Sequence, residues 1–439
     1  MKDSMEMTFG ECSQGMTSTQ EIVVTGLGVV SPIGIGAAPF WASLREGRSG
    51  IGRLSWESGS LRPQPFGGAV ADFDPKQYVR PRKSLKVMSR EIQLGFAAAD
   101  MACSAAGVGP GAQDPERLGV VLGADIIPCE LSELIGTYRD CLVDGRFDFS
   151  RWGKAFANEL FPLWMLKYLP NMPACHIGIA QDARGPNNTL TLGDVSTLGA
   201  ISEAARTIDR GQADVMIAGG TGSRIHAALY ARNQIFGQSQ RDGDPAAASR
   251  PFDADRDGVV QGEGAGALIL ESRRHADARG VAPLARLLGF AGAFEPRADG
   301  QPLRGDAIRR ALATALKNAG RTPEQVGCVV AHGTSAVHGD RIESQAIHEV
   351  LGDVPVTAPK SFFGYLSAAS GALESVLAVL TLQQGAIPPT LNYATPDPQC
   401  PIRVVHGGVD PLERPVVLVL SYSLHGQAVA LAFGRPEAD

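Results

Sequence analysis

Short apolar runs alternate with stretches of helical periodicity along most of the chain. The runs EIVVTGLGVV (21–30), ADVMIAGG (213–220) and VVLVLSYS (416–423) are predominantly apolar, which is typical of strands buried on both faces of a sheet. The stretch DAIRRALATALKNAG (306–320) repeats apolar residues every three to four positions and therefore predicts an amphipathic helix. This alternation predicts an α/β fold in layers, with helices covering both faces of the sheets.

The order of predicted elements is similar in two parts of the chain, residues 21–275 and 280–435. We therefore predict two related halves. Residues 125–182 are less regular and rich in aromatic residues, which predicts a helical insertion. The insertion could cover a cavity or a subunit contact, and the alternative is that its aromatic residues form local core. Residues 1–20 are polar and lack the apolar region of a signal peptide, so we expect a disordered tail.

Composition excludes several classes of protein. The chain of 439 residues has 44% hydrophobic residues, 20% charged residues and a net charge of −6, whereas proteins that bind nucleic acid are usually basic. No apolar run of about 18 residues predicts a membrane span. The seven cysteines are scattered without a C-x-x-C pair, so we expect no metal site, no disulfide framework and a cytoplasmic location.

Two weaker motifs predict no site. GLGVVS (26–31) lacks the third glycine of a dinucleotide-binding fingerprint. DADRDGVVQGE (253–263) has three aspartates at the offsets of a calcium loop, but Gly264 stands where the bidentate carboxylate belongs. We expect instead a loop held by internal ion pairs that include Arg250 and Arg256.

Six segments resemble signature stretches of the β-ketoacyl–acyl carrier protein synthases and occur in the same order. They are ADVMIAGG (213–220), SRPFDADRDGVVQGEGAGALILE (249–271), AHGTS (331–335), GDRIESQA (339–346), APKSFFGYLSAASGALE (358–374) and GAIPPTLN (385–392). The resemblance spans nearly all of residues 21–433. It implies a thiolase-like fold, in which two similar halves form five layers in the order α-β-α-β-α. It also implies a dimer, an acyl carrier protein as partner, a role in fatty acid or polyketide biosynthesis, and no cofactor.

The resemblance also implies a set of site residues. Enzymes of this family use a cysteine on a tight turn at a helix N-terminus, where the free N–H groups lower the thiol pKa. Two histidines support decarboxylation and the developing enolate, backbone N–H groups form an oxyanion hole, and a lysine and a glutamate support the site. By position, His332 in AHGTS matches the first histidine, Lys360 the lysine and Glu343 the glutamate.

The chain departs from the family at the nucleophile. Counting forward from GPNN (185–188) and back from the strand at 213–220 places Asp194 at the cysteine position. An aspartate cannot form the thioester intermediate. We therefore expect Asp194 to cap the following helix by accepting backbone N–H bonds. Ser196 replaces the nucleophile only if the alignment is displaced by two residues.

Two further departures affect the remaining site. KSFFGYL places Tyr365 at the second histidine position, and a phenol of pKa near 10 is a poor acid–base substitute for imidazole. The glycine-rich C-terminal motif of the family reads SLHGQA (423–428), in which only Gly426 remains. The oxyanion hole expected at Leu424 is therefore altered, and His425 is either a new functional imidazole or a surface histidine.

Two hypotheses follow from these departures. The chain is either a non-condensing partner of a cysteine-bearing synthase, similar to the chain-length factors of type II polyketide systems, or an acyltransferase or thioesterase-like enzyme with altered chemistry. The partner would form a heterodimer, with a homodimer as the other possible state. A basic stretch between Arg80 and Arg90 either docks an acidic acyl carrier protein or is a solvated charged face. The sequence does not determine acyl chain length or product.

Overall fold

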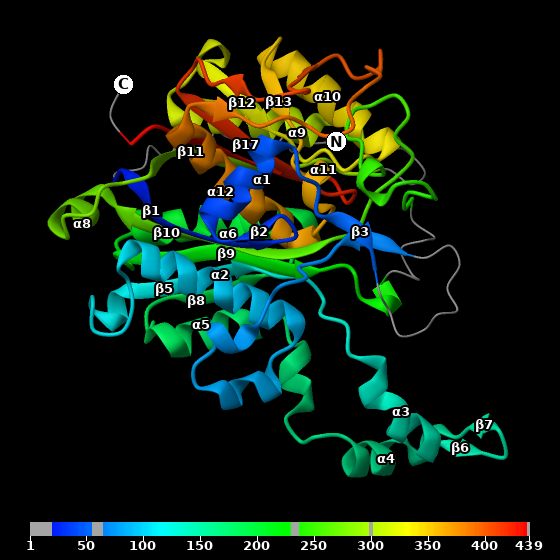
Figure 1. Ribbon diagram of the computed structural model, residues 1–439. Coiled ribbons are helices and arrows are strands. Elements are labelled where there is room, and N and C mark those ends of the chain that lie inside the picture. The colour runs from blue at the N-terminus through cyan, green and yellow to red at the C-terminus, as the bar shows by residue number, and fades with distance from the viewer. Residues whose placement is uncertain (1–19, 55–64, 230–236, 298–301, 437–439) are drawn as a thin grey trace, which may run out of the picture.

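The structure is a computed structural model that describes residues 20–54, 65–229, 237–297 and 302–436. The predicted tail of residues 1–20 therefore lies almost entirely outside the described residues. The described chain forms five layers, in the order helix, sheet, helix, sheet, helix (Figure 1). The layered α/β architecture expected from the alternating pattern is confirmed.

The first half of the fold contains five strands in the spatial order β1-β10-β9-β5-β8. Strands β1, β10 and β9 pair antiparallel, whereas β5 pairs parallel with β9 and β8. The elements are β1 (Ile22–Ser31), α2 (Arg90–Ala106), β5 (Leu118–Gly123), β8 (Asn187–Leu190), α6 (Ser196–Asp209), β9 (Val215–Ser223) and β10 (Glu263–Ser272).

The second half repeats this arrangement with the spatial order β11-β18-β17-β12-β13. The same two antiparallel and two parallel pairings recur in the same places. The elements are β11 (Ala285–Phe294), α9 (Asp306–Ala319), β12 (Val326–Val330), β13 (Pro355–Thr357), α12 (Ser370–Gln384), β17 (Val416–Tyr422) and β18 (Gln427–Gly434). The two related halves predicted from the sequence are therefore present.

The halves join through β1 and β11, which pair antiparallel from Ile22–Leu287 to Val24–Ala285. Helices α6 and α12 lie between the two sheets, where they contact β9 and β10 on one side and β17 on the other (Figure 1). Helix α12 is buried at every position from Ser370 to Leu382, because a helix enclosed by two sheets has no solvent-facing side. The N-termini of these two helices position the candidate site.

Residues 125–182 form an insertion, of which the part with α3, β6, β7 and α4 extends away from the layered body (Figure 1). Its elements are α3 (Leu131–Asp140), β6 (Leu142–Val143), β7 (Arg146–Phe147), α4 (Trp152–Glu159) and α5 (Met172–Gln181). Of these, α5 packs back on α2, whereas α3 and α4 pack on each other. We refer to residues 126–168 as the arm.

The remaining elements lie around the two halves. They are β2 (Gly34–Ile35), α1 (Ala37–Glu46), β3 (Ile51–Arg53), β4 (Phe66–Gly68), α8 (Arg273–Ala278), α10 (Val337–Leu351), α11 (Lys360–Phe363), β14 (Ala386–Ile387), β15 (Arg403–Val404) and β16 (Asp410–Pro411). Within the described part of the chain, no helix combines the length and apolar character needed to cross a membrane.

The loop that imitates a calcium site is held by protein groups. Arg250 Nε lies 3.1 Å from Asp253 Oδ1, and Arg256 Nη1 lies 2.7 Å from Asp397 Oδ2. Asp253 also accepts backbone N–H bonds from Ala394 and Thr395. The predicted ion pairs of Arg250 and Arg256 are therefore confirmed.

Candidate functional site

The site begins at a tight turn before α6. A short 3-10 helix, η6 (Gly193–Val195), links Leu192 to the first residue of α6, and Gly193 has a positive φ of 62°. The Ser196 hydroxyl donates to Gly193 O at 2.7 Å and accepts from Leu192 N at 2.8 Å. Both bonds close the turn, and Ser196 is fully buried. Ser196 therefore has a structural role in the turn, which removes the reason for considering it as a displaced nucleophile.

The same turn recurs before α12 in the second half. There the 3-10 helix η9 (Ser367–Ala369) follows Leu366, whose N–H donates to the Ser370 hydroxyl at 3.2 Å. Ser367 has a positive φ of 51°, and its counterpart Gly193 also has a positive φ, of 62°. The Thr197 hydroxyl donates to the Ala368 carbonyl and so joins the two turns. The centre of the site is therefore built from two equivalent helix starts that face each other.

Asp194 lies within η6 and does not cap α6. The N-cap residue of α6 is Val195, and no side chain caps this helix. The Asp194 carboxyl interacts instead with the Tyr365 hydroxyl, which lowers the Asp194 pKa in part, while its Oδ1 atom is buried without a hydrogen-bond partner. The predicted capping role is therefore wrong, because the 3-10 turn delays the helix start to Ser196, whose own hydroxyl already accepts the free N–H of the turn.

His332 follows β12 and lies opposite Asp194. Its ring is 3% exposed, and its Nε2 lies 3.9 Å from Asp194 Oδ1, which is longer than a direct hydrogen bond. Glu343 of α10 holds the backbone here, accepting from the N–H groups of His332 at 2.6 Å and Gly333 at 2.9 Å. Burial raises the pKa of the Glu343 carboxyl to about 8, with the nearby Asp340 charge adding to this effect.

Lys360 is buried at the start of α11 with 1% of its surface exposed. Its ammonium group forms an ion pair with Glu374 of α12 and donates to His332 O at 2.5 Å. Because an unpaired buried charge is very costly, this pair ties α11, α12 and the segment after β12 together. Burial raises the pKa of Glu374 to about 7, and the Lys360 charge opposes that rise.

The same lysine sets the protonation of His332. Lys360 Nζ lies 3.2 Å from His332 Nδ1, and an ammonium group has only donors. Nδ1 must therefore accept, which places the imidazole hydrogen on Nε2, facing Asp194. Burial, together with the Lys360 charge, holds the pKa of His332 well below its usual value, so this ring is a neutral hydrogen-bond donor near pH 7.

Tyr365 stands across from His332, with ring centroids 6.4 Å apart and planes at 89°. Its hydroxyl interacts with the Asp194 carboxyl. Burial and the Asp194 charge hold the Tyr365 pKa well above 10, so the phenol remains a donor. Burial also raises the pKa of Asp194, while the Tyr365 bond and the Lys360 charge lower it in part. The site therefore pairs a carboxyl with a phenol at the two positions where the resemblance implies a thiol and an imidazole.

The structure does not bring the side chains of Leu424 and His425 into this cluster. Both lie on the turn between β17 and β18 and are exposed, Leu424 by 61%. The Ser423 hydroxyl accepts the His425 N–H at 3.2 Å, and Gly426 keeps a positive φ of 92°. The binding roles suggested for Leu424 and His425 remain predictions.

Three site residues were not anticipated from the sequence. The Ser421 hydroxyl donates to the Asp194 carbonyl at 2.9 Å and lies 3.3 Å from His332 Nδ1. Glu374 and Ser367 lie inside the quoted segment 358–374, but no local pattern sets them apart. In the described parts of the chain, no group of three or more His, Cys, Asp or Glu side chains is placed to hold a metal ion.

Comparison with known proteins identifies the family to which the chain belongs. The β-ketoacyl synthase N-terminal domain family matches residues 19–276, and the β-ketoacyl synthase C-terminal domain family matches residues 284–394. The chain belongs to the β-ketoacyl synthase family. The thiolase-like fold and the family resemblance expected from the sequence are confirmed.

Curated relatives within the β-ketoacyl synthase family cover nearly the whole chain. The 3-oxoacyl-[acyl-carrier-protein] synthase 2 of Synechocystis sp. is 34% identical over 95% of this chain and 98% of its own. The putative polyketide β-ketoacyl synthase 1 of Streptomyces cyaneus is 35% identical over 95% and 99%. The family therefore places the chain in fatty acid or polyketide biosynthesis.

Solved β-ketoacyl synthase structures resemble the chain over similar lengths. The ishigamide ketosynthase/chain length factor has a TM-score of 0.83 at 28% identity, covering 95% of this chain and 99% of its own. A type II polyketide ketosynthase, solved in complex with its acyl carrier protein and bound to the hexaketide, has a TM-score of 0.80 at 29% identity, covering 96% and 100%. Both synthases and chain-length factors are thus among the structural neighbours.

The Asp194→Asn variant should become more stable relative to wild type as pH rises. Because the folded-state pKa of Asp194 lies above its unfolded value, ionising the carboxyl costs stability. That cost is absent below the unfolded pKa and complete above the folded pKa. It amounts to about 1.4 kcal/mol for each unit by which the pKa is raised. Urea unfolding midpoints of both proteins, between about pH 5 and about pH 8, measure this difference.

The exposed carboxyl of Asp72 provides the control. The stability difference between Asp72→Asn and wild type should not change with pH, because the Asp72 side chain is exposed. A constant difference between Asp194→Asn and wild type across the range would show that Asp194 ionises as freely as a surface carboxyl, contrary to its buried position.

Proposed function

We propose that this chain is a non-condensing partner of a cysteine-bearing β-ketoacyl synthase. One observation carries the proposal: Asp194 occupies the turn before α6, and Tyr365, on the segment that precedes α12, interacts with its carboxyl. A condensing enzyme needs a nucleophile there that accepts the acyl group from a thioester. A carboxylate attacking a thioester would form a reactive anhydride, and its partner phenol is too weak an acid to replace an imidazole near pH 7.

The arm supports a partner role because it exposes apolar surface. Its rings form a continuous series in which Trp152 contacts Tyr138 at 5.4 Å and Phe149 at 6.4 Å between centroids, and Trp164 contacts Phe156 at 5.6 Å. Several of its apolar side chains are nevertheless about half exposed or more: Leu131, Leu142, Phe147, Phe149, Phe161 and Met165. Exposed apolar surface of this extent is typical of an interface with another protein.

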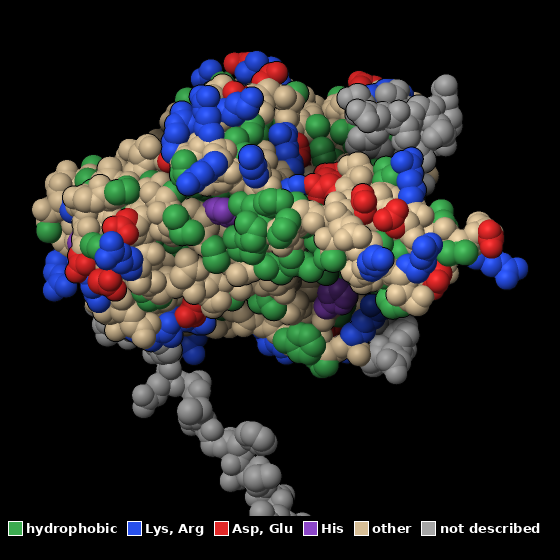
Figure 2. All heavy atoms as spheres, turned by 90° about the horizontal axis from the view of Figure 1, so that it is seen from below, with side chains coloured by type: hydrophobic (Ala, Val, Ile, Leu, Met, Phe, Trp, Pro, Cys, Tyr) green, Lys and Arg blue, Asp and Glu red, His purple; other side chains and the backbone are tan. Residues whose placement is uncertain are grey.

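Strand β8 supplies a second indication of a partner. It lies at the edge of the sheet beside β5, and Asn187 and Asn188 are exposed. An unpaired strand edge readily adds a further strand from another chain. The lower side of the molecule, which carries α3 and α4, also shows a patch of hydrophobic side chains near its centre (Figure 2). A synthase subunit pairing at β8 would cover this side and contact the arm.

An acyl carrier protein is the second proposed partner. Arg80, Arg82, Lys83 and Lys86 are exposed and lie together in the chain, which suits an acidic carrier protein. Arg90, which ends this basic stretch, is engaged instead with buried Glu263 at 2.9 Å. The docking surface we propose therefore consists of the first four residues. A related type II polyketide ketosynthase was solved in complex with its acyl carrier protein, which supports a carrier protein as partner.

A second candidate function rests on the charged groups that remain. His332, Lys360 and Glu343 are buried, and both Lys360 and Glu343 bond to His332. The Asp194 carboxyl, whose pKa is raised, lies 3.9 Å from His332 Nε2. Such a carboxyl can act as a general base toward water. An acyltransferase or thioesterase activity on acyl carrier protein thioesters would follow. It differs from the partner role in needing no second subunit for turnover.

Asp194→Cys alone should not restore condensation, whereas Asp194→Cys with Tyr365→His should gain activity. The new thiol would lie at the start of α6, where the helix N-terminus favours the thiolate. The single variant still lacks the second imidazole, which is worth about 10²–10⁴ in rate. Intact-mass detection of the acyl adduct and chromatography of the ketoacyl product separate acylation from condensation.

Wild type and the single variant Tyr365→His serve as controls, and neither should form an acyl adduct within residues 193–197. An adduct on wild-type Asp194 or Ser196 would contradict the non-condensing role. Efficient condensation by Asp194→Cys alone would show that Tyr365 substitutes for the imidazole after all.

When this chain is coexpressed with a cysteine-bearing synthase of its own organism, the two should copurify as a heterodimer. Phe149→Asp in the arm should weaken this heterodimer, because it buries a charge in an apolar interface. Phe294→Asp, at a similarly exposed phenylalanine on β11, should not. Size exclusion followed by native mass analysis measures the complex. A homodimer that binds none of these synthases, yet turns over an acyl thioester, would favour the altered-enzyme function.

A further inference from the structure

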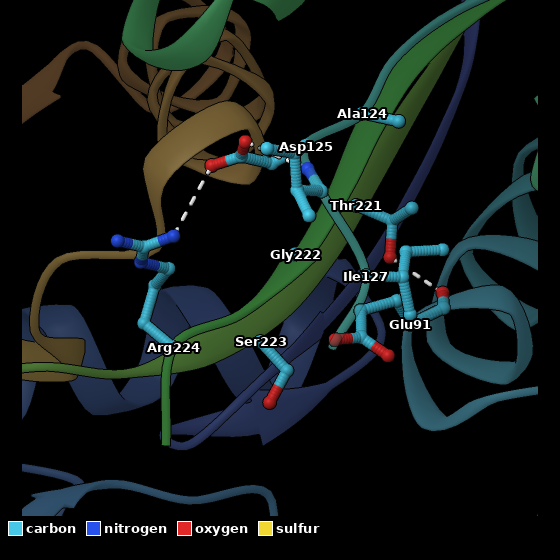
Figure 3. Close-up of a pocket in the computed structure, with 9 residues that line it drawn as sticks. Glu91, Ala124, Asp125, Ile127, Thr221, Gly222, Ser223 and Arg224 are labelled. Carbon is cyan, nitrogen blue, oxygen red and sulfur yellow. Dashed lines mark hydrogen bonds and ion pairs between the residues drawn. The ribbon is translucent and has the colours of Figure 1, made fainter. Parts of the chain in front are cut away.

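A small cavity lies where strands β5 and β9 separate. The two strands pair in parallel as far as Gly123 and Gly220, and beyond these residues the segments 124–127 and 221–224 line the cavity. The first turn of α2 contributes Glu91 (Figure 3). The volume of about 10 Å³ is at the lower limit for one particle of the size of water.

The other acidic side chains near the cavity are paired or solvated. Glu263 of β10 lies 2.9 Å from Arg90, and Asp125 lies 3.3 Å from Arg224. Figure 3 shows the Arg224 guanidinium directed at Asp125. The side chain of Glu130 is 59% exposed, so water solvates its charge. None of these carboxyls therefore requires a further cation.

Glu91 is the remaining carboxyl and has no cation of its own. The residue is 7% exposed. In the described part of the chain it forms no ion pair, and Figure 3 draws no interaction from its carboxyl to the other residues around the cavity. Burial raises the pKa of Glu91 to about 7, and the charges of Glu263 and Glu130 add to this effect. An ionised Glu91 thus leaves one uncompensated negative charge in the interior.

Two hydroxyls that line the cavity with Glu91 have already committed their hydrogens. Ser223 Oγ donates to Glu263 Oε2 at 3.1 Å, and Thr221 Oγ1 donates to the backbone oxygen of Glu91 at 2.6 Å. Because a hydroxyl has a single hydrogen, these two oxygens can offer only lone pairs to whatever occupies the cavity. Carboxylate and other oxygen atoms of this kind are the ligands that hard cations prefer.

Charge and size together favour a monovalent ion. Calcium requires more oxygen ligands than a cavity of this volume can present, and magnesium keeps several of its own waters. A divalent ion would also replace one uncompensated buried charge by another of opposite sign, which is costly. A single positive charge on an ion of about the size of water, such as potassium or ammonium, balances Glu91.

We propose that the cavity between Glu91, Thr221 and Ser223 binds a monovalent cation. Glu91 supplies the balancing charge, and the two hydroxyl oxygens are further ligands. The ion joins the start of α2 to the end of β9 and to the segment 124–127, from which the arm begins, so it stabilises the arm at its attachment to the body. This site goes beyond the proposed partner role and does not depend on it.

Urea unfolding of the full chain in potassium chloride tests the site, with choline chloride replacing potassium so that ionic strength stays constant. The unfolding equilibrium constant should fall by about tenfold for each tenfold rise in potassium concentration above the dissociation constant. Glu91→Gln keeps the shape of the side chain without its charge and should abolish this dependence. Asp100→Asn, on the same helix, should retain it. Because protons compete for the Glu91 carboxyl, the dependence should be stronger at about pH 8 than at about pH 6.

Thallium(I), which resembles potassium in charge and size, locates the ion directly. Wild-type crystals soaked in thallium acetate should show an anomalous peak beside Glu91 that crystals of Glu91→Gln lack. Equal wild-type stability in potassium and choline, a missing thallium peak, or a potassium dependence retained by Glu91→Gln would each overturn the site. Stability that varies with pH but not with potassium would show that Glu91 holds a proton instead. The two wild-type measurements decide the question if Glu91→Gln does not fold.

Discussion

The buried ion pair of Lys360 and Glu374 is the interaction on which the site depends. Lys360 enters from α11, Glu374 from the central helix α12, and the ammonium also bonds the backbone and ring of His332. Removing either charge would leave the other unpaired in the interior, which typically costs several kcal/mol. The pair therefore fixes the position of α11 on α12 and the tautomer of His332 at the same time, whatever occupies the neighbouring turn.

The internal duplication explains why that turn can accept a different residue. Leu192, Gly193 and Ser196 in the first half repeat as Leu366, Ser367 and Ser370 in the second, with matching backbone angles and serine bonds. In the second half the residue equivalent to Asp194 is Ala368. The turn is thus closed by its serine and by backbone geometry, and Ala368 shows that the second turn has the same backbone without a polar side chain at the equivalent position.

Much of the fold could be predicted from the sequence, because buried strands and amphipathic helices have periodic patterns. The positions of His332, Lys360, Glu343, Tyr365 and Asp194 followed from motifs, and the structure brings them together. The capping role of Asp194 was wrong because the pattern does not show a 3-10 turn ahead of α6. Asp125 and Ser367, 242 residues apart, could not be paired in advance, since only the contact between the two halves brings them within hydrogen-bond distance.

The surroundings of Asp194 indicate that this residue does more than fill space in the turn. A carboxyl beside a neutral His332 and a phenol is poorly solvated as an anion, so burial favours its acid form. An alanine would fill the turn without this electrostatic cost, as Ala368 does in the second half. An aspartate there places a titratable carboxyl, beside the Tyr365 hydroxyl, where the family resemblance implies a thiol. The turn can therefore lack the family's thiol and still carry an ionisable side chain.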